Sequence, residues 1–192
     1  MANLAVFASG EGTNFEHIAK AVAQTNHEVV CCICDRKGAP VFSRAERLGI
    51  PAFHIAYEGR SREAAELEII SYCRTFGTDL IALAGFMRVL TNVMIDAFHG
   101  KILNIHPTLL PRFPGIRGIE RSYKSGDSNL GITIHLADYS LDSGPVLLQK
   151  SFKRKGNETV EEIEKKIHAL EYEYYPKVII EKLDTIDGGS TT

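Results

Sequence analysis

"NLAVFASGEGTN", residues 3–14, decides the fold that this sequence predicts. The stretch begins with a short apolar run that is typical of a buried strand and stops at Gly10. A glycine-rich turn follows, and apolar residues then recur at helical spacing over residues 14–25. A strand, a tight turn and a helix in direct succession are typical of the first half of a parallel βαβ unit.

The same alternation continues through the first half of the chain. Short apolar runs predict further strands at residues 28–35, 51–56, 78–85 and 101–105. Helical spacing between them predicts helices at residues 40–49, 61–77 and 91–100, the second with Ser61 as its N-cap. Strands that alternate with helices pair in parallel through right-handed crossovers, so we expect an α/β fold with a doubly wound, Rossmann-like sheet.

The pattern changes in the second half. Residues 130–138 and 145–152 predict two strands joined by only six residues, which is too short for a helical crossover, so they should pair antiparallel and make the sheet mixed. Residues 158–183 predict a long closing helix with a break near Pro176. We expect residues 184–192 to form a flexible tail and residues 1–192 to form a single domain.

The composition excludes several classes of partner. The chain has 192 residues, of which 44% are hydrophobic and 24% charged, with a formal net charge of −2. It carries no long basic stripe, so we expect no nucleic-acid partner. It has no apolar run of the roughly 20 residues that cross a bilayer and no signal peptide, so we expect no membrane partner. The sequence leaves monomer and homodimer equally open.

The four cysteines fit a cytoplasmic protein. Three of them fall in the apolar stretch at residues 28–35, and none has the Cys or His partners at the spacing that a zinc site requires. We therefore expect buried free thiols in a reducing compartment, and no metal. The cysteines are Cys31, Cys32, Cys34 and Cys73.

"SGEGTN", residues 9–14, is a candidate phosphate site. Backbone N–H groups of such a turn and of the helix that follows favour an anion, and Thr13 and Asn14 can add side-chain donors beside Gly12. The motif matches neither the dinucleotide fingerprint nor the Walker loop. A plain tight turn is the alternative, and Asp35 at the end of the next strand leaves a dinucleotide site open.

"NIHP", residues 104–107, is the candidate catalytic motif. Asn104 and His106 share side-chain parity at the end of a predicted strand, so both should face one crevice. Pro107 disfavours a helical conformation at His106 and so keeps the imidazole at the strand tip. An amide donor beside an imidazole suits a reaction with a developing oxyanion and a proton transfer. A buried His that bonds only to backbone is the alternative.

"LDSGP", residues 141–145, supplies a carboxylate. Asp142 is either an ordinary turn residue or a partner that orients the imidazole of His106 and favours its protonated form. The remaining histidines lack such a context, and we expect them to be structural or exposed. They are His17, His27, His54, His99, His135 and His168.

Four motifs in this order resemble one family. "SGEGTN", "LAGFMRVL" (83–90), "LNIHPTLLPRFPG" (103–115) and "LDSGPVLLQ" (141–149) are similar to those of the phosphoribosylglycinamide formyltransferases, over about residues 2–183. The resemblance implies a formyltransferase fold and two small-molecule substrates. The formyl group of 10-formyltetrahydrofolate would pass to the amine of 5′-phosphoribosylglycinamide in purine biosynthesis, without a metal.

The resemblance also implies roles for individual residues. Asn104, His106 and Asp142 match the family's catalytic residues, and Asn104 and Asp142 also border the folate. The nucleotide substrate would bind Gly12, Thr13, Asn14 and Glu171. The folate would contact Arg62, Met87, Arg88, Val89, Leu90, Asp138, Tyr139, Ser140 and Leu141.

Some positions depart from the family pattern, and other readings remain open. Arg117 stands where many members carry a His, which puts an auxiliary imidazole in question, whereas Ser143, Thr13 and Thr108 are mild changes. A methionyl-tRNA formyltransferase would need a further C-terminal domain and a basic surface, and a formyltetrahydrofolate hydrolase a further N-terminal domain. A non-catalytic nucleotide-binding module would need the phosphate turn but not Asn104, His106 and Asp142 together.

Overall fold

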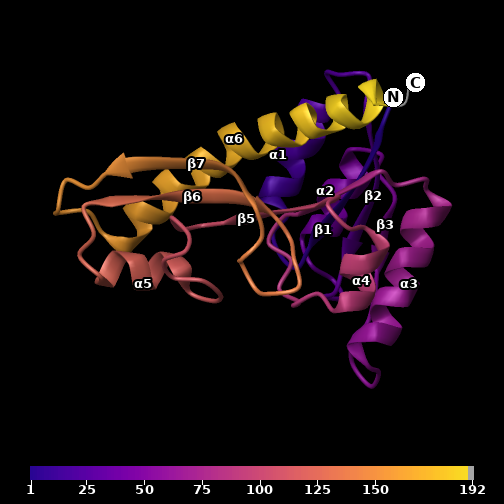
Figure 1. Ribbon diagram of the computed structural model, residues 1–192, viewed down its shortest axis with the longest axis horizontal. Coiled ribbons are helices and arrows are strands. Elements are labelled where there is room, and N and C mark those ends of the chain that lie inside the picture. The colour runs from indigo at the N-terminus through magenta and orange to yellow at the C-terminus, as the bar shows by residue number, and fades with distance from the viewer. Residues whose placement is uncertain (190–192) are drawn as a thin grey trace.

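The computed structural model describes residues 1–189, which form a seven-stranded mixed sheet with helices packed against it (Figure 1). The strands are β1 (Asn3–Ala8), β2 (Glu28–Cys34), β3 (Ala52–His54), β4 (Leu80–Leu83), β5 (Ile102–His106), β6 (Asn129–Leu136) and β7 (Val146–Lys153). The helices are α1 (Thr13–Val22), α2 (Val41–Arg47), α3 (Arg62–Thr75), α4 (Asn92–Ala97), α5 (Gly118–Lys124) and α6 (Val160–Gly188).

The sheet has the predicted doubly wound order. Its strands run β3-β2-β1-β4-β5-β6-β7, and the first five are parallel. β6 pairs antiparallel with β5, and β7 pairs antiparallel with β6, which confirms the predicted change of pattern. The chain reverses its winding direction between β1 and β4, and sheets of this kind bind ligands beyond the carboxyl ends of the strands at that point.

Two apolar layers flank the sheet because side chains alternate along each strand. Leu4 and Val6 of β1 face the layer that contains the apolar sides of α1, α2 and α6. Ala5 and Phe7 of the same strand face the opposite layer, under α3 and α4. The predicted N-cap of α3 is confirmed, since the Ser61 side chain accepts from the amide of Ala64.

The break predicted in the last helix is wrong. α6 is continuous through Pro176, which is buried within it. A proline inside a helix costs about 3 kcal/mol, and tertiary packing offsets this loss. The neighbouring Tyr175 is fully buried and its hydroxyl donates to the carbonyl oxygens of Leu83 and Leu103, which ties this turn of α6 to β4 and β5.

Two further differences concern the ends of elements. α6 extends to Gly188, so the first part of the predicted tail is helical, and residues 190–192 lie outside the described residues. The sequence reading also missed α5, a short helix that begins with a glycine and has only two buried residues, Gly118 and Ser122. Such a helix carries too little apolar periodicity to be predicted.

Candidate active site

Asn104 and His106 lie on β5, between β4 and β6, and both reach Asp142. The amide nitrogen Nδ2 of Asn104 donates to Oδ1 of Asp142 at 3.3 Å. Nδ1 of His106 lies 3.3 Å from Oδ2 of the same carboxylate. The equal parity predicted for the two β5 residues therefore brings both to one side of the strand, where they meet the carboxylate.

The position of Asp142 depends on a tightly folded connection between β6 and β7. Asp142 has a left-handed backbone with φ of 52°. Two residues later, a Cβ on Gly144 would lie 2.0 Å from the carbonyl oxygen of Leu136, so only glycine allows this approach. The amide of Gly115 donates to Oδ2 of Asp142 at 2.7 Å and closes the connection over the site.

The environment of Asp142 favours its charged form. Burial alone would raise the pKa of this carboxyl group. His135 when its ring is protonated, the amide of Gly115 and the positive charge that His106 can carry act in the opposite direction, and together they hold the pKa of Asp142 below its ordinary value of 3.8. The His135 contact is electrostatic rather than a close hydrogen bond, since its Nε2 lies 3.6 Å from Oδ1. Asp142 is therefore an anion at neutral pH.

His106 is held on both sides of its ring. Its Nε2 donates to the carbonyl oxygen of Phe113 at 2.8 Å, and since a carbonyl only accepts, Nε2 carries a hydrogen in this arrangement. The space beside the ring is closed by Gly118, where an added Cβ would lie 3.3 Å from Nε2 and 2.8 Å from Cγ2 of Thr108. The imidazole is 5% exposed, so its orientation is set by these contacts.

His135 is buried in the same cluster, a contact that the sequence did not predict. It lies directly opposite Asn104 in the β5–β6 pairing. Its Nδ1 bonds to the carbonyl oxygen of Leu136 at 2.8 Å, so its Nε2 is free to accept from Nδ2 of Asn104 at 3.2 Å. The antiparallel register would have revealed this pair, but sequence periodicity does not fix a register between strands.

The predicted phosphate turn is built around Gly12. This residue has φ of 72°, and a Cβ there would lie 2.5 Å from Cγ2 of Val41. α1 begins at the next residue, Thr13, so the first N–H groups of the helix point out of its end, where an anion could accept from them. The turn therefore has the conformation that the sequence predicted for it.

Asn14 joins this turn to the last helix. Its Nδ2 donates to Oε2 of Glu171 in α6 at 3.0 Å, which brings together two of the predicted substrate residues. Glu171 is buried, and Oε2 is also 3.0 Å from Nδ1 of His168. Oδ1 of Asn14 is buried and accepts no hydrogen bond from residues 1–189. A ligand with N–H or O–H groups would satisfy this oxygen.

The segment predicted to border the folate follows β4 at the switch point. The amide of Met87 donates to Oγ of Ser9 at 2.8 Å, which ties the segment to the end of β1. Nε of Arg88 donates to Oδ2 of Asp35 at 2.6 Å, and its guanidinium lies 4.7 Å from the ring centre of Tyr57. The Arg88 side chain thus anchors the segment to β2, and Asp35 serves this contact rather than an open ribose site.

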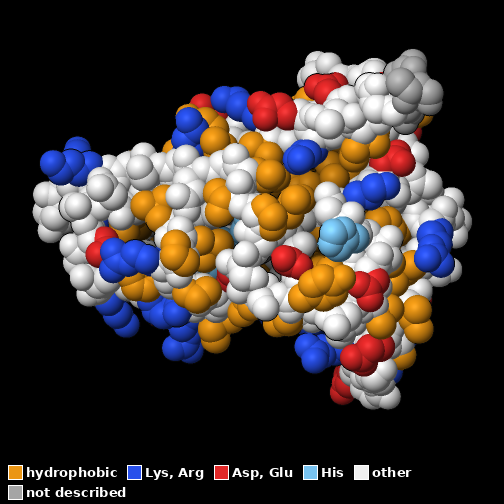
Figure 2. Space-filling model, in the orientation of Figure 1, with side chains coloured by type: hydrophobic (Ala, Val, Ile, Leu, Met, Phe, Trp, Pro, Cys, Tyr) orange, Lys and Arg blue, Asp and Glu red, His pale blue; other side chains and the backbone are white. Residues whose placement is uncertain are grey.

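The predicted folate segments also expose large apolar side chains. Met87 is 60% exposed, Val89 50%, and Tyr139 and Leu141 56% each. Exposed apolar side chains that cluster beside polar groups often mark a ligand site. Figure 2 shows that other parts of the surface carry charge instead, with basic side chains gathered at the end of the molecule where α5 lies.

The structure does not bring every predicted residue to the centre. Arg62 is exposed as the first residue of α3, and its side chain makes no hydrogen bond or ion pair within residues 1–189. The hydroxyl of Tyr139 donates to Asp96 at 2.6 Å, at the end of α4.

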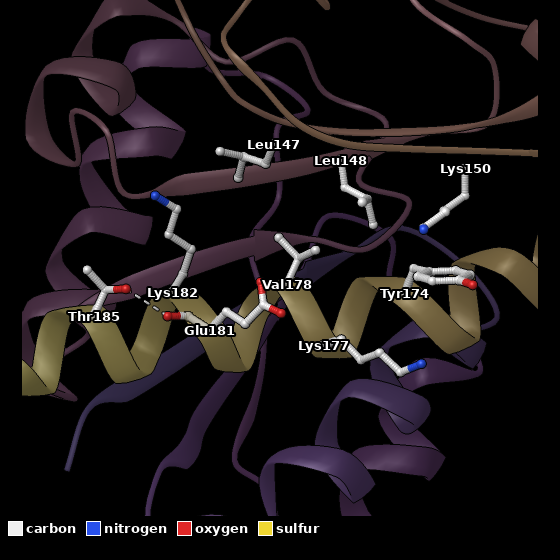
Figure 3. Close-up of a pocket in the computed structure, with 9 residues that line it drawn as sticks. All are labelled: Leu147, Leu148, Lys150, Tyr174, Lys177, Val178, Glu181, Lys182 and Thr185. Carbon is white, nitrogen blue, oxygen red and sulfur yellow. Dashed lines mark hydrogen bonds between the residues drawn. The ribbon is translucent and has the colours of Figure 1, made fainter.

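Two hollows in the structure lie away from this cluster. One, of about 420 Å³, runs between β7 and α6, where Lys150 and Lys177 approach the ring of Tyr174 (Figure 3). The other, of about 580 Å³, lies between the ends of α3 and α4. Neither hollow is lined by Asn104, His106 or Asp142. We therefore locate the candidate site by its polar cluster and not by the volume of a hollow.

Neither a metal cluster nor a membrane span is found in the described part of the chain. Residues 1–189 contain no group of three or more His, Cys, Asp or Glu side chains placed to hold a metal ion. None of the helices formed by these residues is both long and apolar enough to cross a membrane.

Comparison with known proteins gives consistent matches. The family model described as formyl transferase matches residues 2–179. A phosphoribosylglycinamide formyltransferase of Bacillus subtilis is 42% identical, over 93% of each chain. That of Haemophilus influenzae is 34% identical, over 93% of this chain and 86% of the other. Glycinamide ribonucleotide transformylase 1 of Geobacillus kaustophilus has a solved structure that matches with a TM-score of 0.92 and 42% identity, over 95% of this chain and 99% of that one.

Proposed function

Because the chain belongs to the formyl transferase family, we infer that it performs the formyl transfer of purine biosynthesis for which its close relatives are named. It transfers the formyl group of 10-formyltetrahydrofolate to the amine of 5′-phosphoribosylglycinamide. The products are formylglycinamide ribonucleotide and tetrahydrofolate. The meeting of Asn104, His106 and Asp142 at the end of β5, at the same edge of the parallel strands as the turn after β1, is the observation that carries this conclusion for the present chain.

The nucleotide substrate binds, in our proposal, at the turn before α1. The backbone N–H groups that follow Gly12, with the side chains of Thr13 and Asn14, hold the phosphate. Glu171 and the unpaired Oδ1 of Asn14 accept from N–H or O–H groups of the rest of the nucleotide. The supporting observation is that the Asn14–Glu171 bond places both acceptors next to the phosphate turn.

The folate binds, in our proposal, between the segment after β4 and the connection from β6 to β7. Met87 and Val89 on one side and Leu141 on the other offer exposed apolar surface for an aromatic ring system. The backbone of this segment supplies polar contacts, because the side chain of Arg88 is already bound to Asp35. Neither Arg62 nor Tyr139 hydrogen-bonds to the catalytic cluster here, and we propose that both side chains turn toward the folate when it binds.

The reaction needs one new bond, one broken bond and one moved proton. The substrate amine attacks the formyl carbon, and a tetrahedral intermediate with an oxyanion forms. A hydrogen bond from Asn104 and the positive charge that the His106 ring can carry stabilise the oxyanion, as preorganised groups do. A proton passes from the attacking nitrogen to N10 of the folate with the help of His106 and Asp142, and the bond from carbon to N10 then breaks.

The resting hydrogen bonds indicate how Asn104 can take part. Its Nδ2 carries two hydrogens, and these point to His135 Nε2 at 3.2 Å and to Asp142 Oδ1 at 3.3 Å. We propose that the oxyanion replaces the longer of these bonds, the one to Asp142. The bond to His135 then keeps the amide in place during the reaction.

Compartment and assembly remain proposals of the same kind. The four cysteines are buried and free of disulfides, which supports a reducing compartment and hence the cytoplasm. We propose a monomer or a homodimer that acts on small molecules alone, and a net charge of −2 supports the absence of a nucleic-acid partner.

One assay tests the function. Absorbance reports the consumption of 10-formyl-5,8-dideazafolate, with and without phosphoribosylglycinamide. Turnover should require the nucleotide, and His106→Ala should lower kcat by about 10²–10⁴-fold, the usual contribution of acid–base help. His54→Gln, a change at an exposed residue of β3, serves as the matched control. Turnover without the nucleotide would indicate a hydrolase instead, and His106→Ala with more than a tenth of the normal kcat would refute the catalytic role.

A further inference from the structure

His168 lies beside the proposed nucleotide site, and the mechanism above does not use it. It precedes Glu171 by one turn of α6, and its Nδ1 is 3.0 Å from Oε2 of that carboxylate. Its ring stacks on Tyr172, with centroids 6.0 Å apart and planes at 12°. The same tyrosine also stacks on His17 of α1, with centroids 4.0 Å apart and planes at 11°.

We propose that His168 is a positioning residue that orients the Glu171 carboxylate toward the nucleotide substrate and balances its charge. This inference rests on the proposed function, in which Glu171 contacts that substrate. His168 itself does not touch the reacting atoms.

The orientation follows from the bonds that Glu171 makes. Its Oε2 accepts from Asn14 of α1 and from His168 of α6, so one oxygen is held from two helices. Its Oε1 has no such partner among residues 1–189 and is left to accept from a ligand. A carboxylate that is fixed through one oxygen presents the other in a single direction, which reduces the entropy lost on binding.

The charge balance follows from the neighbourhood of Glu171. Asn14 belongs to the proposed phosphate turn and also bonds to Glu171, so a carboxylate lies close to the place of an anionic group. An unbalanced negative charge there would oppose the binding of a phosphorylated substrate. Protonated His168 supplies the missing positive charge. The side chain of Glu171 is 7% exposed and that of His168 is 46% exposed, so solvent screens this pair from one side only.

The surroundings of His168 favour the protonated ring. The hydrogen bond to Glu171 raises the pKa of His168 above 6.5, burial lowers it in part, and the charges of Glu171 and of Glu164 on the same helix raise it further. From α1, the ionisable side chain that stacks on the same tyrosine is His17. The charge balance is therefore present below the raised pKa and is lost as the pH rises through it.

The test compares KM for phosphoribosylglycinamide from pH 5.5 to 8.5 in four proteins. These are the wild type, His168→Gln, His168→Leu and the control His54→Gln. Gln keeps a donor for Glu171 but cannot be charged, whereas Leu removes both. The substrate phosphate and amine also titrate in or near this range, with a phosphate pKa of about 6, so the ratio of variant to wild-type KM isolates His168.

The expected results differ between the variants. His168→Leu should raise KM for the nucleotide by about 5- to 20-fold near pH 6, as expected for a lost charge-assisted hydrogen bond. His168→Gln should show its largest KM ratio at low pH and approach the wild type at high pH. KM for the folate and kcat should stay within about twofold, since His168 lies outside the catalytic cluster. His54→Gln should match the wild type throughout.

An NMR titration of the His168 ring separates this inference from the function on which it rests. Glu171→Gln should lower the pKa of His168. Suppose that the wild type transfers formyl groups but the ratio of the His168→Gln KM to the wild-type KM stays constant with pH. That result would overturn the positioning role alone. The same holds if the pKa of His168 does not change in Glu171→Gln. A wild type without any transfer to the nucleotide would overturn the proposed function itself, whatever the titration shows.

Discussion

Oδ2 of Asp142 lies 3.3 Å from Nδ1 of His106, although one residue ends β5 and the other lies in the connection after β6. The same carboxylate accepts from Asn104 through its other oxygen. Asp142 therefore bridges the two β5 residues that we propose as catalytic. An aspartate that only shaped a turn would have no reason to direct both of its carboxylate oxygens at side chains of β5.

Asp142→Asn should lower kcat by about 10²–10⁴-fold, because it removes the charge that supports proton transfer through His106. The fold should persist, since Asn also adopts the left-handed conformation that φ of 52° requires. Steady-state kinetics and thermal unfolding of both proteins test this. Glu46→Gln, at an exposed carboxylate of α2, is the control.

The pH dependence of stability gives a second check on Asp142. Its pKa is lowered on folding, so the charged carboxylate stabilises the fold above its unfolded pKa near 3.8, and this contribution is lost as the pH falls through the lower folded value. The stability difference between wild type and Asp142→Asn should shrink as the pH falls below about 4. A difference that stays the same from about pH 5 down to about pH 2 would assign the effect to another group.

His135→Leu should lower kcat by about 3- to 10-fold, because the Asn104 amide loses its acceptor at 3.2 Å and is held less firmly. His135→Gln keeps an acceptor at a similar reach and should retain more activity than His135→Leu. KM for either substrate should change little in both variants. Equal losses in the two variants would mean that His135 acts through packing and not through its hydrogen bond to Asn104.

Gly12→Ala and Gly38→Ala form a matched pair, since both glycines have φ of 72°. Each change should cost about 1–2 kcal/mol for a left-handed alanine. In Gly12→Ala the new Cβ also overlaps with Val41 and disturbs the phosphate turn. In Gly38→Ala the new Cβ meets no atom within 4 Å. Urea unfolding should therefore show the larger loss for Gly12→Ala. In Gly12→Ala, KM for the nucleotide should rise by about tenfold or more, whereas KM for the folate should not. If Gly12→Ala and Gly38→Ala had the same KM for the nucleotide, this would argue against a phosphate site at Gly12.

Asp35→Asn should raise KM for the folate by about 3- to 10-fold and leave KM for the nucleotide nearly unchanged. The change weakens the bond from Arg88 and so loosens the segment from Met87 to Leu90. Tyr57→Phe keeps the ring beside the guanidinium and removes a hydroxyl that has no partner within residues 1–189, so it should bind folate normally. Folate binding that is weakened equally by both changes would indicate a general disturbance of this region.

The sequence by itself determined the features that depend on local pattern. Alternating apolar runs and helical spacing identified every strand and every helix except α5, because side-chain burial repeats every two residues in a strand and every 3.6 in a helix. The same parity placed Asn104 and His106 on one side of β5. Resemblance to a family, rather than periodicity, supplied the partnership with Asp142.

Only the tertiary structure decided which distant residues meet. The pairing of His135 with Asn104 depends on the register between β5 and β6, which brings these two residues opposite each other. The bond between Asn14 and Glu171 depends on how α1 packs against α6. The continuity of α6 through Pro176 depends on tertiary packing in the same way, there against β4 and β5. Burial over the whole fold outweighs local propensity at such places, and a sequence pattern records only the local part.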